Sequence, residues 1–168
     1  MTIAIIDYKA GNCTSVLNAF ASLGVETVVT READVIAKAE RIVFPGVGAA
    51  KSAMENLTAF GLADVVREQA LSGKPFLGIC LGMQILFEHS EEDGGVNLLN
   101  ILPGKVKRFP DTPGFKIPEI GPYTTGRTEY AGVTFTSAVR KGNLFAYQFH
   151  PEKSGKAGLA LLKEFATC

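Results

Sequence analysis

The chain has 168 residues and a mass of 17.9 kDa, enough for one domain built around a single core. Hydrophobic residues make up 46% of it and charged residues 20%, as in ordinary soluble globular proteins, which argues against a disordered tail or a disulfide-stapled miniprotein. Its 17 basic side chains balance its 17 acidic ones. This balance argues against nucleic acid as the main partner, since phosphate binding usually needs a basic excess.

Neither a membrane nor an oxidising environment is indicated. No apolar run approaches the roughly 18 to 20 residues that cross a bilayer, and the first residues lack the features of a signal peptide. The three cysteines are widely spaced and odd in number, which does not suggest a disulfide framework. We therefore expect a reduced, cytoplasmic protein with no membrane partner.

The first half alternates short apolar runs, typical of buried strands, with segments whose apolar residues recur at helical spacing. Strands are expected at 3–6, 26–29, 42–44 and 75–79. Helices are expected at 16–23, 54–73 and 81–87. This alternation predicts an α/β fold, a wound and mostly parallel sheet with helices on both faces, like a flavodoxin-like core.

The second half predicts short strands with few helices between them. Apolar residues favour strands near 106–109, 133–139 and 144–149, and a closing helix at 159–165. The stretch 110–130 is rich in Pro and Gly and shows little periodicity. We expect a single domain, 1–168, whose second half adds a smaller antiparallel β portion.

The sharpest local motif is Gly78-Ile79-Cys80-Leu81-Gly82, which follows a predicted strand and precedes a predicted helix. This is the nucleophile-elbow pattern with cysteine as the nucleophile. A thiol at a helix N-terminus is favoured in its thiolate form, and the N–H of Leu81 becomes a donor for an oxyanion. The competing interpretation is that Cys80 is a small buried hydrophobic residue between packing glycines.

A cysteine nucleophile needs a base, and the sequence has only two histidines. His89 follows Cys80 in the predicted helix at about 13 Å along the axis, too far for a hydrogen bond. His150 lies in a strand-like run, in which alternation places Glu152 on the same side, where a carboxylate can orient the imidazole. Alternatively, His-Pro-Glu is an ordinary strand end.

The segment Pro45-Gly46-Val47-Gly48 follows the third predicted strand, at the sheet edge where ligands bind. Its N–H groups could complete an oxyanion hole. A dinucleotide loop is the rival interpretation, but Lys51 stands where that fingerprint needs glycine, and no Walker pattern occurs. We expect no cofactor and no metal.

With these motifs, the chain resembles the class I glutamine amidotransferases. The longer strings Asp7-Tyr8-Lys9-Ala10-Gly11-Asn12, Gly78 to Gln84 and His150 to Gly158 are similar to those of the glutaminase subunits of imidazole glycerol phosphate synthase, an enzyme of histidine biosynthesis. The resemblance covers about the first 110 residues and the chain from about Thr128 onward.

The resemblance implies a Cys80–His150–Glu152 triad that hydrolyses glutamine to glutamate and ammonia through a thioester. It implies an oxyanion hole from Leu81 with the Val47–Gly48 loop, and a loop that reorganises at Val47 on activation. It also implies a heterodimer, in which ammonia passes to a (β/α)8-barrel cyclase that forms imidazole glycerol phosphate and AICAR. The residues implied to bind glutamine are Gly46, Gln84 and Glu92.

Two departures from the family pattern stand out. Lys9 occupies a position where glycine is common, and the chain is short, with residues expected to be missing near Gly121–Pro122. That stretch would help to bind glutamine and face the partner. The alternatives are a glutaminase of another class I pathway, such as those of anthranilate, GMP or pyridoxal phosphate, and a non-amidotransferase cysteine hydrolase or redox or chaperone protein.

Overall fold

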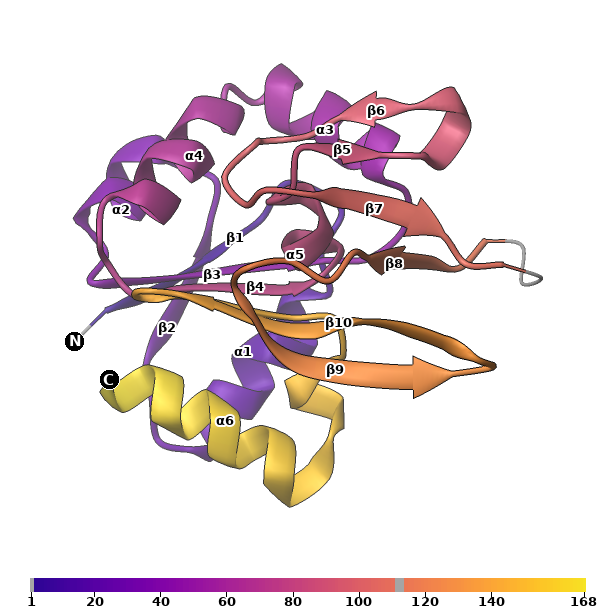
Figure 1. Cartoon of the computed structure of the whole chain (residues 1–168). Helices are drawn as coiled ribbons and strands as arrows, with labels where there is room; N and C mark the ends of the chain where they lie inside the picture. Colours follow the sequence, from indigo (N-terminus) through magenta and orange to yellow (C-terminus); the bar gives the residue numbers. More distant parts are fainter. Residues whose placement is uncertain (1, 111–113) are drawn as a thin grey trace.

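The computed structural model describes residues 2–110 and 114–168. Its main sheet has seven strands in the order β2-β1-β3-β4-β11-β10-β9 (Figure 1). The first five are parallel, and the hairpin of the last two is antiparallel. The strands are β1 (Ile3–Ile6), β2 (Thr27–Thr30), β3 (Arg41–Gly46), β4 (Phe76–Cys80), β9 (Thr124–Tyr130), β10 (Val133–Lys141) and β11 (Leu144–Tyr147).

Helices cover both faces of this sheet (Figure 1), as the alternating pattern predicts. One face carries α1 (Cys13–Ser22) and α6 (Gly155–Thr167), whose Phe20 and Phe165 pack against the central strands. The other carries α2 (Ala33–Lys38), α3 (Ala50–Ala59) and α4 (Ala63–Leu71). Two separate apolar cores therefore hold the sheet rigid from both sides.

A smaller sheet, β6-β5-β7-β8, lies beside the main one (Figure 1). Its strands are β5 (His89–Ser90), β6 (Val96–Asn97), β7 (Lys105–Arg108) and β8 (Lys116–Pro118), with one parallel and two antiparallel pairings. The short helix α5 (Leu81–Ile85) joins it to β4, and Val106 contributes to the shared core. The fold class predicted from the sequence is confirmed.

Several predicted elements are wrong in detail. The helix expected at 54–73 is two helices, because the chain turns between them at Gly61, whose φ is +65°. The helix expected at 81–87 ends at Ile85, so His89 lies in β5 and not in that helix. α2 was not predicted. The strand expected to stop before Pro45 continues to Gly46, where it pairs with β4 alone because its pairing with β1 ends at Val43.

Candidate active site

Cys80 lies at the turn between β4 and α5, as the elbow motif predicts. Its φ is 55° and its ψ −112°, a backbone conformation that costs energy for any residue other than glycine. Close packing of the turn against β3 explains why residue 82 is a glycine. A Cβ on Gly82 would lie 1.9 Å from the carbonyl oxygen of Phe44 in β3. The strained turn is therefore held in place by backbone contact with the neighbouring strand.

His150 and Glu152 meet across a short turn that follows β11. The imidazole Nδ1 lies 2.8 Å from Glu152 Oε1, and the Glu152 side chain is 1% exposed. The strand alternation used to predict this pair is wrong, because β11 ends at Tyr147 and Glu152 lies in the 3₁₀ turn η2 (Pro151–Lys153). The turn, and not a strand, folds the carboxylate back onto the ring.

Two neighbours of His150 favour the charged form of its imidazole. Its interaction with the sulfur of Cys80, and secondly its hydrogen bond with Glu152, raise the pKa of His150 from 6.5 to about 9, although partial burial opposes this. Because Nδ1 faces Glu152, the other ring nitrogen is the one available to the sulfur. The three side chains therefore interact, whereas His89 pairs its Nδ1 with Asn97 Oδ1 at 3.3 Å in the small sheet.

The loop after β3 also lies beside Cys80, because Gly48 and Cys80 line one cavity, which is described below. A Cβ on Gly46 would lie 2.3 Å from the Tyr8 hydroxyl oxygen, so that position has no room for a side chain. The N–H of Val47 donates to the carbonyl of Ala10 at 2.6 Å. Val47 was expected to serve the oxyanion hole, but in this conformation its N–H is already used.

A cavity of about 590 Å³ opens at the sulfur of Cys80. Its lining includes Leu81, Gln84 and Gln148. It also includes three aromatic residues, where the ring of Phe109 lies 5.8 Å from that of Tyr130 and 6.5 Å from that of Phe135 between ring centres. The cavity is large enough for a small-molecule substrate. Its remaining lining residues are Gly48, Gly114, Phe115, Lys116, Ile117 and Thr128.

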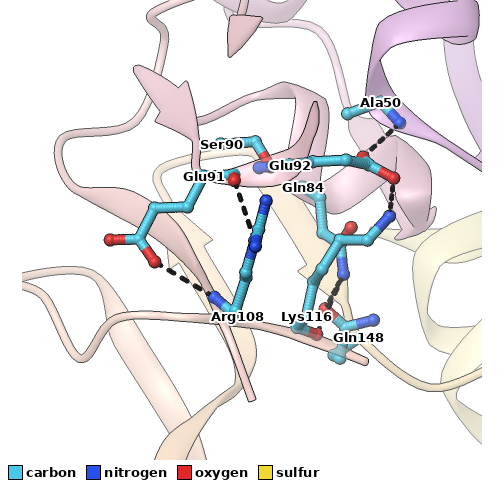
Figure 2. Close-up of polar contacts among 8 residues, drawn as sticks. All are labelled: Ala50, Gln84, Ser90, Glu91, Glu92, Arg108, Lys116 and Gln148. Atoms are coloured by element: carbon cyan, nitrogen blue, oxygen red, sulfur yellow. Dashed lines mark hydrogen bonds and ion pairs between the residues drawn. The ribbon is translucent and has the colours of Figure 1, made fainter. Parts of the chain in front are cut away.

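Two residues expected to bind glutamine belong to a buried polar network (Figure 2). Glu92 Oε2 accepts the N–H of Ala50, the first residue of α3, at 2.6 Å, and its other oxygen pairs with the ammonium of Lys116. Gln84 donates from Nε2 to the carbonyl of Lys116 at 3.3 Å and to Oε1 of Gln148 at 2.9 Å. The carboxylate of Glu92 is thus fully engaged within the protein.

Sequence reasoning assigned no role to Lys116 or Gln148. Lys116 reaches the site only through the pairing of β8 with β7 in the small sheet, which no local pattern announces. The sequence signal for Gln148 is its place in the strand-like run that leads to His150, because the parallel pairing of β11 with β4 brings that run beside Cys80.

Among the described residues there is neither a metal-binding cluster nor a membrane-spanning helix. Within residues 2–110 and 114–168, no group of three His, Cys, Asp or Glu side chains is placed to hold a metal ion. Over the same described ranges, no helix has the length and apolar character needed to cross a membrane.

Known proteins resemble this chain in sequence and in fold. The family described as "Glutamine amidotransferase class-I" matches residues 4–117. The imidazole glycerol phosphate synthase subunit HisH of Methanothermobacter thermautotrophicus is 39% identical over 196 residues, covering 97% of this chain and 96% of the relative. HisH of Acinetobacter baylyi is 40% identical over 198 residues, with coverages of 97% and 96%.

Solved structures show the same fold. A crystal structure described as a glutamine amidotransferase superposes with a TM-score of 0.74 at 19% identity, over 99% of both chains. PurLQS from Thermotoga maritima superposes with a TM-score of 0.67 at 18% identity, over 99% of this chain and 97% of the other. The fold and the matching family thus define a class I glutamine amidotransferase. Within that class, the chain belongs to the family of the imidazole glycerol phosphate synthase subunit HisH.

The chain is shorter than its alignments with these relatives, which include gaps. The two alignments run over 196 and 198 residues, whereas the chain has 168, so these relatives contain residues with no counterpart here. That the difference falls near Gly121–Pro122 stays a prediction. Here those residues join β8 to β9 through a tight turn, in which the N–H of Thr124 donates to the carbonyl of Gly121 at 3.1 Å.

Proposed function

We propose that the chain is the glutaminase subunit of an imidazole glycerol phosphate synthase, with Cys80 as nucleophile, His150 as acid and base, and Glu152 as the group that orients His150. The observation that carries the proposal is the position of His150 at the carboxyl edge of the sheet, where its imidazole faces Glu152 on one side and interacts with the sulfur of Cys80. There a strained turn presents the sulfur to a substrate-sized cavity.

The reaction begins with Cys80 as thiolate and His150 as imidazolium. The sulfur attacks the side-chain carbonyl carbon of glutamine, and the carbonyl oxygen becomes an oxyanion. The N–H groups of Leu81 and Gly48, joined by that of Val47 once the loop is activated, are the donors proposed for it. His150 gives its proton to the nitrogen as the carbon–nitrogen bond breaks, so that ammonia leaves and a thioester remains.

Water completes the cycle. Neutral His150 takes a proton from a water molecule, whose oxygen attacks the thioester carbon, and the second tetrahedral intermediate expels the sulfur as thiolate. Glutamate leaves and the imidazolium–thiolate pair is restored. Glu152 keeps Nδ1 engaged throughout, so that the other ring nitrogen faces the reacting atoms.

Ammonia is proposed to pass to a partner subunit, because the curated relatives are subunits of a synthase. In the proposed complex the partner is a (β/α)8-barrel cyclase, which uses the ammonia to form imidazole glycerol phosphate and AICAR. Activation would require the loop after β3 to turn the N–H of Val47 away from Ala10 and toward the oxyanion.

A quenched-flow experiment with labelled glutamine tests the chemistry directly. We expect label to accumulate on the peptide that contains Cys80, as a thioester that hydroxylamine releases, and none on Cys80→Ala. Glutamate formation without a covalent intermediate at Cys80, or equal turnover by Cys80→Ala, would refute the assignment. Separately, Gln84→Ala should raise KM for glutamine if Gln84 binds the substrate.

A further inference from the structure

Gln148 places a polar side chain within hydrogen-bonding distance of the proposed nucleophile. Its Nε2 lies 3.8 Å from Cys80 Sγ, within the range of an N–H donating to sulfur. The residue follows β11 directly, and its backbone N–H donates to the carbonyl of Ser137 in β10 at 2.9 Å. Its position at the sulfur is therefore set by the strand pairing of the main sheet.

The orientation of the Gln148 amide is determined by its neighbours. A side-chain amide can be turned over, so the atom that faces the sulfur depends on what the other end contacts. The carbonyl of Lys116 can only accept, so Gln84 turns its NH₂ toward it. The same NH₂ donates to Oε1 of Gln148 at 2.9 Å, which leaves the Gln148 NH₂ facing Cys80 (Figure 2 shows the contacts among Lys116, Gln84 and Gln148).

The hydrogen bonds that orient Gln148 depend on a buried ion pair. Lys116 is held by its ion pair with Glu92, whose other oxygen accepts the N–H of Ala50 at 2.6 Å (Figure 2). Gln84 and Glu92 are 6% and 8% exposed, so little of either side chain is accessible to water. A donor supported in this way is preorganised, which is the property that makes a hydrogen bond to a charged group effective.

We propose that Gln148 is a further catalytic residue, whose amide N–H holds the Cys80 thiolate in place for attack, with Gln84 acting as its positioning residue. The inference rests on the proposed role of Cys80 as nucleophile. Two donors then share the sulfur: the imidazolium of His150, which is consumed when ammonia leaves, and the amide of Gln148, which cannot lose its proton. When the second tetrahedral intermediate collapses, the amide is in position to receive the thiolate again.

The test is the rate at which iodoacetamide alkylates Cys80 as a function of pH, followed by peptide mass spectrometry. It needs neither glutamine nor a partner, so it can succeed or fail independently of the proposed function. The exposed Cys168 serves as the internal standard in every sample. An unfolded variant would reveal itself through faster alkylation of the half-buried Cys13.

Four variants separate donation from packing. Gln148→Leu removes the donor, and Gln148→Glu replaces it with an acceptor that repels the thiolate. Gln84→Leu leaves Gln148 in place but frees its amide to turn. Gln69→Leu is the matched control, because Gln69 is also a buried amide, with 5% of its surface exposed. Its side chain accepts a hydrogen bond from Lys74, which precedes β4, whereas Cys80 ends that strand.

We expect both Gln148 variants to alkylate Cys80 about tenfold more slowly at neutral pH, to regain the wild-type rate in alkali, and to shift the midpoint of the profile upward. Gln84→Leu should give a smaller shift of the same sign, and Gln69→Leu none. A profile for Gln148→Leu that superimposes on the wild type would overturn the proposal, even if glutaminase activity fell. Upward shifts without any wild-type glutaminase activity would support the donor and reject the proposed function.

Discussion

Replacing Gly82 by alanine tests whether backbone contact holds the elbow in position. In the structure, the added Cβ would lie 1.9 Å from the carbonyl oxygen of Phe44 and 2.9 Å from its carbonyl carbon. Real Cβ atoms essentially never come within 3.0 Å of another atom, so α5 and β3 must separate by about 1 Å. Neither partner is a flexible side chain that could move aside.

Two consequences follow from this displacement. Overpacking of this kind costs about 1–3 kcal/mol of unfolding free energy. A displacement of about 1 Å at the first turn of α5 also moves the N–H of Leu81 and the sulfur of Cys80, and misplacement of this size lowers rates by about 100-fold. We therefore expect Gly82→Ala to lose far more activity than its loss of stability alone would cause.

Urea unfolding and glutamate release, measured on the same preparations, check this expectation. Gly121→Ala is the control, because the nearest atom to its Cβ would be the carbonyl oxygen of Pro103 at an ordinary 3.7 Å. It should change stability by less than about 0.5 kcal/mol and leave activity unaltered. If Gly82→Ala were folded and turned over glutamine at the wild-type rate, the account of the elbow would be wrong.

Three further predictions concern the site. Cys80→Ala should abolish glutamate release while leaving the urea midpoint nearly unchanged, and activity above background would contradict its role. Since the pKa of His150 is raised to about 9 in the folded protein, its interactions stabilise the fold fully below about pH 6.5 and are lost as pH rises through about 9. The difference in unfolding free energy between the wild type and Glu152→Gln should shrink across that interval, and a constant difference would reject the linkage. Glu92→Ala should cost about 3–5 kcal/mol of unfolding free energy, measured by urea titration, because it leaves the ammonium of Lys116 without its partner; a loss below about 1 kcal/mol would show that water replaces the pair.

The sequence predicts the sheet better than the helices around it. Continuous apolar runs mark the parallel strands because both faces of the sheet are covered. By contrast, α2 buries only Ile36, which is too little for a helical period to appear. The break at Gly61 is invisible because Leu57 and Leu62, on either side of it, enter the same core and extend the apparent period.

The candidate site shows a similar division. Cys80 could be predicted because an elbow is a local device, in which the strand, the turn and the helix are adjacent in the sequence. The pairing of His150 with Glu152 was predicted for a wrong reason, since a 3₁₀ turn replaces the expected strand. Lys116 could not be found at all, because only the tertiary packing of the small sheet brings it to Glu92.

The central claim is that this chain hydrolyses glutamine for a partner subunit. The most direct measurement is glutamate release from glutamine, with and without a barrel cyclase subunit and its phosphoribulosyl ligand, on a chain confirmed by mass to have 168 residues. The account predicts a low rate alone and a large increase when both are added, with none in Cys80→Ala. No glutamate release under any of these conditions would contradict it.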